Sequence, residues 1–339
     1  MSKKHIVIPV FIPHKGCPFD CIYCNQKVIS GQTEEMTVEK MDEIICSHLS
    51  TAREDSYIEI GFFGGSFTGI EVEKQIMFLE SANKYILQSK IKGIRLSTRP
   101  DYIDSEILHR LKEYNVNIIE LGVQSLDEDV LRKSGRGHGT EEVYKACSLI
   151  KENGIGLGIQ TMIGLPGSNF DKDLDTAQKV VEIKPQIVRI YPTLVVRNTY
   201  LEKMYCDGSY TPLDLEEAVN LSAKLLELYN KNGIKVIRIG LQPTDNINDN
   251  FDVVGGPFHP SFRQLVESRL WLYRIENYIK EYSLFKEHDI IIYADSKNLC
   301  DIIGQRRGNI EYLKNKYQFR KISIKSIEDH KDEFFIRGL

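Results

Sequence analysis

The sequence predicts an α/β protein with a parallel sheet, followed by a small α+β module at the C-terminus. Short β-branched apolar runs alternate with helical patterns up to about residue 243. The runs are nearly continuous in hydrophobicity, which is typical of parallel strands covered on both faces. Repeated βα units of this kind imply right-handed crossovers. The predicted strands are Ile6–Ile12, Tyr57–Phe63, Ile94–Thr98, Asn117–Gln124, Leu157–Ile163, Ile187–Leu194 and Ile234–Leu241.

Amphipathic helices are predicted between these runs. The clearest is Leu215–Tyr229, in which apolar residues recur at helical spacing. Asp214 and Glu217 match a capping box at its start. The helix ends with a Gly before the next strand, at Gly233, and an earlier helix ends in the same way at Gly154.

Polar motifs follow the strands at their carboxyl ends, which is the face where (β/α) barrels carry their active sites. Periodicity alone does not separate a barrel from a flat doubly wound sheet, and this placement favours the barrel. In chain order the motifs are a cysteine cluster after the first strand, GGSFT after the second, STRPD on the third, GVQS on the fourth and GLPG after the fifth.

The cysteine cluster lies in the stretch Gly16–Asn25, which reads GCPFDCIYCN. Cys17, Cys21 and Cys24 have CxxxCxxC spacing, and Tyr23 precedes the third cysteine. Zinc sites commonly use CxxC pairs and four closed ligands, whereas a 4Fe–4S cluster takes one thiolate per iron. Three thiolates would leave one iron open for a ligand. Zinc, and ordinary cysteines in a turn, are the alternative interpretations.

This stretch resembles the CxxxCx(aromatic)C signature of radical S-adenosylmethionine (SAM) enzymes. The resemblance implies a partial (β/α)6 TIM-like barrel with a 4Fe–4S cluster and SAM as cofactors. Cys17, Cys21 and Cys24 would be metal ligands and catalytic residues, with Tyr23 beside the cofactor. In that family the open iron binds SAM, and one electron cleaves SAM to methionine and a 5′-deoxyadenosyl radical that abstracts hydrogen. An electron donor of flavodoxin or ferredoxin type is a further implied partner.

The other motifs resemble the SAM-binding motifs of the same family. Gly64, Gly65 and Ser66 stand where the family has a GGE motif that holds the SAM ammonium, so Ser66 replaces a glutamate. The separation of Gln124 from Arg136 resembles that in oxygen-independent coproporphyrinogen oxidase and the elongator catalytic subunit. The resemblance implies that Arg136 pairs with the SAM carboxylate, a role suited to a planar guanidinium. Glu120, Gln124 and Gln160 are the remaining candidates for binding SAM polar groups.

The region from about residue 90 to 243 resembles the elongator catalytic subunit more closely than other radical SAM enzymes. The shared runs are STRPD, ELGVQS through GRGH, GLPGS and IYPTLVVRNT. Arg99 and Tyr191 are placed near the substrate. That family has a longer first cysteine gap and a C-terminal acetyltransferase domain, and no acetyl-CoA loop is recognisable here. Wobble-uridine carboxymethylation is therefore not expected of this chain acting alone.

The C-terminal module is predicted to have strand–helix–helix–strand order. The run IIGQRRGNI resembles the core of KH domains, IIGxxGxxI, with Arg307 in place of the second glycine. KH domains clamp a nucleic-acid backbone with this loop. From Ser296 to Ile327, eight Lys and Arg residues face only two acidic residues. Arg306 and Arg307 are the candidate RNA contacts; a solvated helix ending in a glycine cap is the alternative.

Composition bounds the remaining possibilities. The chain of 339 residues has 42% hydrophobic and 27% charged residues, ordinary values for a globular protein. No run of about 18 apolar residues predicts a membrane span, and no signal-peptide cleavage site follows the N-terminal apolar run, so a cytoplasmic protein is expected. The net charge of −4 excludes a globally basic nucleic-acid binder but not a local basic patch. The four remaining cysteines are scattered and suggest neither a second cluster nor disulfides.

Three functions are compatible with these features. The leading hypothesis is a radical SAM enzyme that modifies RNA, with tRNA as its substrate. The second is a radical SAM enzyme acting on a small molecule such as a tetrapyrrole precursor. The third is an RNA-binding subunit with a structural or sensory cluster. The predicted division is 1–243 for the barrel, 244–283 for a loop and connecting helix, and 284–339 for the basic KH-like module.

Overall fold

The computed structural model describes residues 5–12, 21–25, 35–241, 252–327 and 334–339. The chain divides into two compact units. The first comprises Met1–Asp214 and Tyr229–Phe258, and the second comprises Leu215–Leu228 and His259–Leu339. The helix α9 (Leu215–Lys231) spans the division. Among the described residues, no helix is long and apolar enough to cross a membrane.

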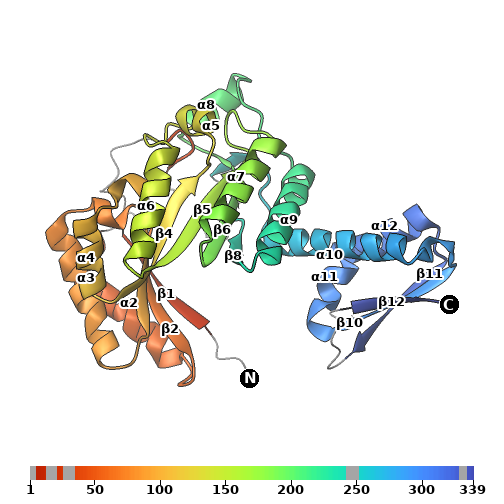
Figure 1. Ribbon diagram of the computed structural model, residues 1–339, viewed down its shortest axis with the longest axis horizontal. Helices are drawn as coiled ribbons and strands as arrows, with labels where there is room; N and C mark the ends of the chain where they lie inside the picture. The colour runs from red at the N-terminus through yellow and green to blue at the C-terminus, as the bar shows by residue number, and fades with distance from the viewer. Residues whose placement is uncertain (1–4, 13–20, 26–34, 242–251, 328–333) are drawn as a thin grey trace. The chain divides into compact units, whose positions relative to one another are not determined.

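The first unit is built on a seven-stranded sheet in the order β1-β2-β3-β4-β5-β6-β8, with every neighbouring pair parallel (Figure 1). This confirms the predicted α/β class and the partial TIM-like barrel, because β1 and β8 are the two edges of an open sheet. The strands are β1 His5–Phe11, β2 Tyr57–Phe63, β3 Gly93–Thr98, β4 Val116–Gln124, β5 Gly156–Ile163, β6 Ile187–Pro192 and β8 Lys235–Ile239.

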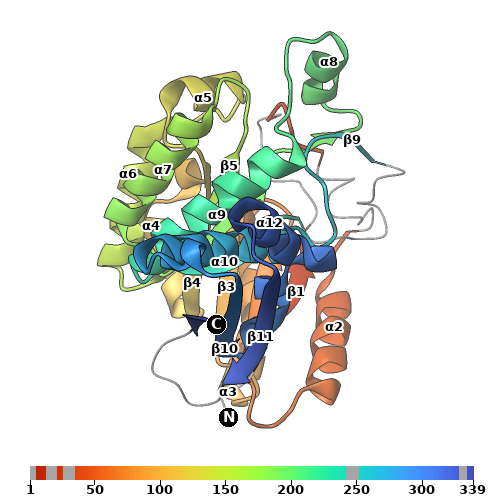
Figure 2. The same ribbon diagram turned by 90° about the vertical axis from the view of Figure 1, so that its right-hand side faces the viewer.

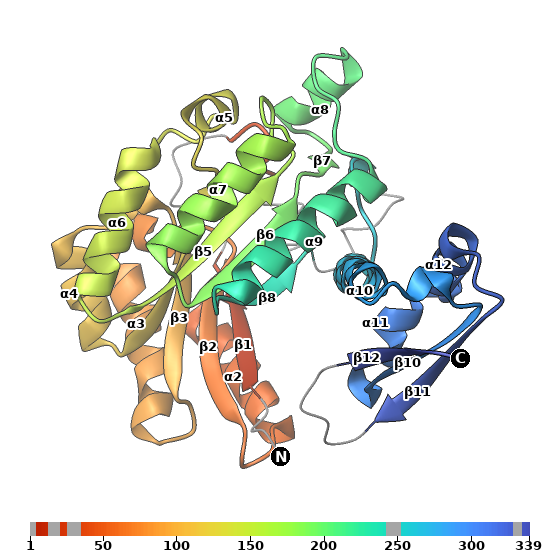
Figure 3. The ribbon, with the colours of Figure 1, turned by 45° about the vertical axis from the view of Figure 1, so that its right-hand side comes forward.

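Helices follow the strands as the βα pattern predicts, and Figure 3 shows α3, α4, α6 and α7 along one face of the sheet. Polar N-caps begin several of them: Asp104 accepts a hydrogen bond from the Ile107 amide at 2.8 Å, which satisfies a donor that helix geometry leaves open. The helices are α2 Val38–Thr51, α3 Val72–Leu87, α4 Ser105–Glu113, α5 Glu128–Lys133, α6 Thr140–Glu152, α7 Phe170–Ile183 and α8 Tyr200–Cys206. The 3₁₀ turns η1 Phe67–Gly69 and η2 Pro100–Tyr102 follow β2 and β3.

A two-stranded sheet lies beyond β6. β7 (Val195–Val196) pairs antiparallel with β9 (Val253–Gly255). The sequence predicted a loop over Thr244–Pro260, and this is wrong for Val253–Gly255. The polar, glycine-rich composition hid a strand of only three residues, which is shaped by its pairing partner rather than by its own hydrophobic pattern. Residues 244–251 of this segment lie outside the described residues.

The second unit holds a three-stranded sheet in the order β11-β10-β12. β10 (Asp289–Asp295) runs parallel to β11 (Lys321–Ile327) and antiparallel to β12 (Phe334–Gly338). The first two strands and the intervening helices match the predicted order, whereas β12 was not predicted. Its helices are α10 Phe262–Glu281, α11 Leu299–Ile303 and α12 Gly308–Tyr317, with 3₁₀ turns η3 Leu284–Lys286, η4 Ser296–Asn298 and η5 Gln305–Arg307.

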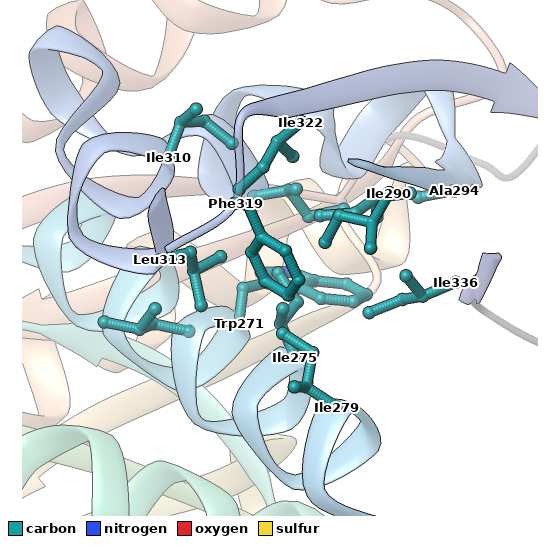
Figure 4. Packing of buried hydrophobic residues seen from close by; sticks show 13 residues of the cluster. Trp271, Ile275, Ile279, Ile290, Ala294, Ile310, Leu313, Phe319, Ile322 and Ile336 are labelled. Atoms are coloured by element: carbon teal, nitrogen blue, oxygen red, sulfur yellow. The ribbon is translucent and has the colours of Figure 1, made fainter. Parts of the chain in front are cut away.

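One face of this sheet carries the core of the second unit. Ile290, Ile292 and Ala294 of β10 are fully buried against α10 and α12, together with Ile322 and Ile336 of the flanking strands (Figure 4). Figure 2 shows α10 and α12 together with β10 and β11 from the side. Because side chains alternate across a strand, the intervening residues Ile291, Tyr293 and Phe335 face away from the helices.

Candidate functional site

A row of alternating charges crosses the face of the large sheet opposite the helices. Glu59 of β2 pairs with Arg95 of β3, which reaches Glu120 of β4 at 3.3 Å. Arg189 of β6 closes the row, with its Nε 2.5 Å from Oε2 of Glu120. At most 12% of any of these four side chains is exposed. Charges buried this deeply require partners, and here two carboxylates balance two guanidinium groups. These four residues are called the floor of the site.

The ends of this row are also hydrogen-bonded. Oε1 of Glu59 accepts from Asn117 at 3.0 Å, and His5 Nε2 lies 2.6 Å from its Oε2. Burial alone would raise the pKa of Glu59, but Arg95, Asn117 and His5 outweigh it and hold that pKa below its ordinary value. The guanidinium of Arg189 stacks over the Phe63 ring at 5.0 Å. Side chains therefore link β1, β2, β3, β4 and β6, in addition to the hydrogen bonds of the sheet.

Glu120 belongs to this floor. Its Oε1 accepts hydrogen bonds from Arg95 and Arg189, the second at 2.9 Å. Only 1% of the residue is exposed. The sequence placed Glu120 among the candidate SAM-binding residues; in the structure its carboxylate is engaged by two arginines, and a contact with SAM stays a prediction.

More polar side chains lie on the same face of the sheet, closer to the carboxyl ends of the strands than the floor. Gln160 of β5 donates to Ser97 Oγ at 3.1 Å, and the Tyr191 hydroxyl accepts from Arg189 at 3.3 Å. Gln124 ends β4 with a φ of 69°, and its buried Oε1 has no hydrogen-bond partner among the described residues. A buried amide oxygen without a partner is costly, so this position suits a ligand that donates a hydrogen bond.

Arg136 connects the strand ends to the cysteines. Its Nη1 donates to Sγ of Cys21 and to the Tyr23 hydroxyl, each at 3.4 Å. Its Nη2 donates to the carbonyl oxygen of Gly122. A side chain at Gly122 would lie 3.5 Å from Nη2 of Arg136 and 3.1 Å from Nε2 of Gln124, so the bare glycine leaves room for both groups.

Arg136 is held in place at its backbone by Arg99 and at its guanidinium by His138. Arg99 donates to the backbone carbonyl of Arg136 at 2.5 Å while pairing with Asp101 at 2.9 Å. His138 Nε2 accepts from Arg136 Nε at 3.3 Å, and its Nδ1 lies 3.2 Å from the Gly139 carbonyl. This arrangement requires a neutral imidazole protonated on Nδ1. Burial and the adjacent Arg136 lower the pKa of His138 to about 4.

The segment Cys21–Asn25 is held in place by backbone bonds to distant parts of the first unit. The Cys24 amide donates to the Cys21 carbonyl at 2.9 Å. The Ile22 amide donates to the Ser134 carbonyl at 3.2 Å, and the Ile22 carbonyl accepts from the Leu201 amide at 2.8 Å. Burial raises the pKa of Tyr23, partly offset by Arg136, so its phenol stays protonated. The third predicted ligand, Cys17, lies outside the described residues.

The loop after β2 lies beside the end of β1. Gly64 has a φ of 98°, and a Cβ there would stand 2.9 Å from the Ile12 carbonyl oxygen. Only glycine meets both constraints. Gly65 follows in the same loop, and Ser66 is buried with 6% exposed. This loop therefore approaches the point where β1 leads into the cysteine segment.

The described residues of this site suit a cofactor with a carboxylate group beside thiolate ligands. Two cysteine sulfurs within one turn, a buried guanidinium 3.4 Å from one of them and an unpartnered amide oxygen at Gln124 form a compatible donor set. They fit a cluster bound by thiolates and a ligand that carries both a carboxylate and donor groups.

Sequence reasoning missed the buried floor and the role of His138. The signal was available: Glu59, Arg95 and Arg189 are lone charges inside apolar strand runs, where burial without a partner would be prohibitive. Ser97, the partner of Gln160, carried no comparable signal. Outside this site, Arg306 and Arg307 lie exposed on the turn η5, with φ values of 51° and 65°.

Comparisons with known proteins agree with this geometry. The family model "Radical SAM superfamily" matches residues 11–180, and "Radical_SAM C-terminal domain" matches residues 185–271. A tRNA uridine(34) acetyltransferase of Methanocaldococcus infernus is 31% identical over 184 residues, covering 48% of this chain and 34% of that protein. Elongator complex protein 3 of Saccharomyces cerevisiae is 30% identical over 179 residues, covering 52% of this chain and 31% of that protein.

The fold has a solved counterpart. The structure titled "The archaeal Methanocaldococcus infernus Elp3 with N-terminus deletion (1-46)" superposes with a TM-score of 0.64 at 22% identity, covering 84% of this chain and 64% of that chain. The chain thus spans about a third of the length of the two curated relatives. The predicted resemblance to the elongator family is confirmed.

Proposed function

The chain belongs to the radical SAM superfamily of enzymes, which use a 4Fe–4S cluster and SAM, and on this premise we propose that it generates a radical from SAM to modify RNA, with tRNA as the substrate. The observation that carries the SAM part is Arg136, which stands between Cys21 and the carbonyl end of β4. The RNA part is supported by relatives named as a tRNA uridine(34) acetyltransferase and as Elongator complex protein 3.

The three cysteines and Arg136 have proposed roles in holding the cofactors. Cys17, Cys21 and Cys24 ligate the cluster. Arg136 pairs with the carboxylate of SAM, because its guanidinium is buried, charged and held in plane by His138. When bound, the cluster and SAM supply the 5′-deoxyadenosyl radical that abstracts hydrogen.

The strand ends complete the pocket for SAM. The backbone of Gly64, Gly65 and Ser66 takes the ammonium group, since the open glycine backbone exposes carbonyl oxygens. Gln124 accepts a hydrogen bond through its unpartnered Oε1, and Gln160 binds a hydroxyl. Glu120 contributes indirectly, by holding Arg189 in place through the ion pair between them in the floor.

The substrate side is proposed to lie near Tyr191 and Arg99. Tyr191 shares a sheet face with Gln160 and is oriented by Arg189. Arg99 is committed to Asp101 and to the Arg136 carbonyl, so its effect on substrate is exerted through the position of Arg136. The radical SAM reaction needs an electron donor, and a flavodoxin or ferredoxin in the cytoplasm is the proposed source.

Deuterium transfer tests this proposal. The anaerobically reconstituted protein is given dithionite, SAM and tRNA transcribed from deuterated nucleotides, and 5′-deoxyadenosine is analysed by mass spectrometry. Deuterated 5′-deoxyadenosine is expected. Deuterium transfer from a labelled tetrapyrrole precursor, and not from tRNA, would show that the substrate is a small molecule rather than RNA. If the cluster-loaded protein binds RNA but does not cleave SAM, the remaining hypothesis is an RNA-binding subunit with a structural or sensory cluster.

Arg306 and Arg307 are proposed to contact the RNA backbone. Both are exposed on the tight turn η5, and Asn309, two residues after Arg307, donates to the Ser268 and Asp301 carbonyls at 2.9 and 3.1 Å. Replacing both by Ala should lower tRNA affinity and reduce the slope of log K against log salt by roughly 1.4, about 0.7 for each lost phosphate contact on single strands. Unchanged affinity and slope would remove these two residues from the proposal.

A further inference from the structure

The open face of the small sheet in the second unit carries an aromatic and basic surface. This open face is defined by Tyr293 of β10, Lys325 of β11, and Phe335 and Arg337 of β12. Tyr293 is paired in register with both Lys325 and Phe335. We propose that the open face is a second RNA-binding surface that stacks an unpaired base of single-stranded RNA.

The two aromatic rings form a platform. The Tyr293 and Phe335 rings stack with centroids 4.6 Å apart and planes inclined by 13°. Their neighbours Ile292 and Ile336 are buried in the core on the opposite face, at 0% and 5% exposure, so the backbone cannot turn without losing that packing. The platform is therefore held at a fixed orientation, half-buried at the surface of the sheet.

Cations flank the platform. The guanidinium carbon of Arg337 lies 5.2 Å from the Phe335 ring centre and 5.8 Å from that of Tyr293, and Nζ of Lys325 lies 6.0 Å from the Tyr293 centre. Both side chains are exposed. Neither forms an ion pair within the described part of the chain, whereas the acidic Asp289 on the same face is neutralised by Arg320 at 2.5 Å.

This chemistry fits single-stranded RNA. An unpaired base offers a flat apolar face to aromatic rings, and its flanking phosphates offer charge to Lys and Arg. Charge complementarity extends beyond the open face, since residues 296–327 carry eight basic and two acidic side chains. A nucleic-acid duplex would present phosphates but no exposed base face for the aromatic rings. An acidic protein would account for the basic residues but not for the stacked aromatic rings.

The choice of RNA as the partner rests on the proposed function, but the open face is separate from the SAM site. Its residues lie in the second unit, and those around Arg136 lie in the first. The open face would bind an unpaired part of the substrate RNA, whereas the SAM site binds the cofactor. It adds stacking to the backbone contacts proposed for Arg306 and Arg307.

Fluorescence anisotropy with a labelled twelve-nucleotide oligouridine tests the inference on the full chain. Tyr293→Ala should weaken binding about tenfold or more, because stacking on an aromatic residue is worth that much per base. Tyr293→Phe should retain wild-type affinity, because it keeps the ring that stacks on Phe335 and loses only the hydroxyl. Lys325→Gln with Arg337→Gln should flatten the salt slope by roughly 1.4.

Matched controls are available in the chain. Tyr312 is likewise an exposed tyrosine with a lysine over its ring, Lys316 at 5.1 Å, but it lies on α12. Tyr312→Ala should leave oligouridine affinity unchanged. Lys112→Gln with Lys145→Gln removes two exposed charges from the first unit and should leave the salt slope unchanged.

The outcomes separate this inference from the proposed function. No binding of oligouridine by the wild type, equal losses for Tyr293→Ala and Tyr312→Ala, or equally strong competition by poly-glutamate would each overturn the open face as an RNA site. If the open face binds RNA while labelled tRNA delivers no deuterium, the proposed function fails and the inference stands. If tRNA delivers deuterium and Tyr293→Ala binds normally, the inference fails alone.

Discussion

Nη1 of Arg136 lies 3.4 Å from Sγ of Cys21, although 115 residues separate them in the chain. The contact joins the loop after β1 to the segment after β4, two strands that are not neighbours in the sheet. A sheet curved into a partial barrel brings the carboxyl ends of all its strands toward one rim. The same guanidinium also bonds to Tyr23, Gly122 and His138.

Arg136→Lys should lower the rate of 5′-deoxyadenosine formation by roughly 10- to 100-fold, the value of one or two lost bonds to a charged group. Lysine keeps the charge but cannot donate in several fixed directions. The measurement is single-turnover SAM cleavage with dithionite, at equal iron content. Arg132→Lys serves as the control, because Arg132 is exposed and pairs only with Asp129 in the described structure. Equal rates for both variants would contradict the role of Arg136.

Glu120→Ala should destabilise the first unit by about 3–5 kcal/mol, because it leaves Arg95 and Arg189 buried without their shared partner. Urea unfolding followed by circular dichroism measures this. As the control, Asp175→Ala breaks an exposed pair with Lys179 in the same unit and should cost less than about 1 kcal/mol. A loss for Glu120→Ala as small as that of the control would show that the buried row is not coupled as the structure indicates.

Gly64→Ala should cost about 1–3 kcal/mol, since it combines a positive φ with a Cβ only 2.9 Å from the Ile12 carbonyl oxygen. Gly154→Ala separates the two effects, because Gly154 has a φ of 72° and nothing within 4 Å of its Cβ position. The difference in unfolding free energy between the variants reports the steric part. Identical values would mean that the loop after β2 is not pressed against β1.

The pH dependence of stability should carry a contribution from His138. Its folded pKa of about 4 lies below its unfolded value of 6.5, so the unfolded chain binds the proton first. The contribution is fully present above pH 6.5 and is lost as the pH falls toward 4. Between pH 7 and pH 5 the loss should be about 2 kcal/mol.

His138→Gln isolates this contribution, because glutamine can accept from Arg136 but does not titrate. Unfolding free energies of the wild type and His138→Gln are compared at the two pH values. The variant should lose less stability than the wild type on acidification. Parallel curves would indicate that folding does not lower the pKa of His138.

Much of the fold and part of the site could be predicted from the sequence. The seven runs that became β1 to β6 and β8 were visible because parallel strands are apolar along their whole length. The turn at Gly304–Arg307 between two helices was visible because glycine interrupts the helical pattern. The spacing of Cys17, Cys21 and Cys24 named the superfamily, and its membership is confirmed.

Tertiary structure alone decided which polar groups meet. No local pattern says that Glu120 is shared by Arg95 and Arg189, because their pairing depends on which strands are adjacent and on the register between them. The same holds for Tyr293, which lies beside Phe335 only because the unpredicted strand β12 returns antiparallel to β10. The strands, the cysteine spacing and the family can be recognised from the sequence, because each is encoded by residues close together in the chain. The contacts of Arg136 and the open face form only when folding brings together segments that are far apart in the chain.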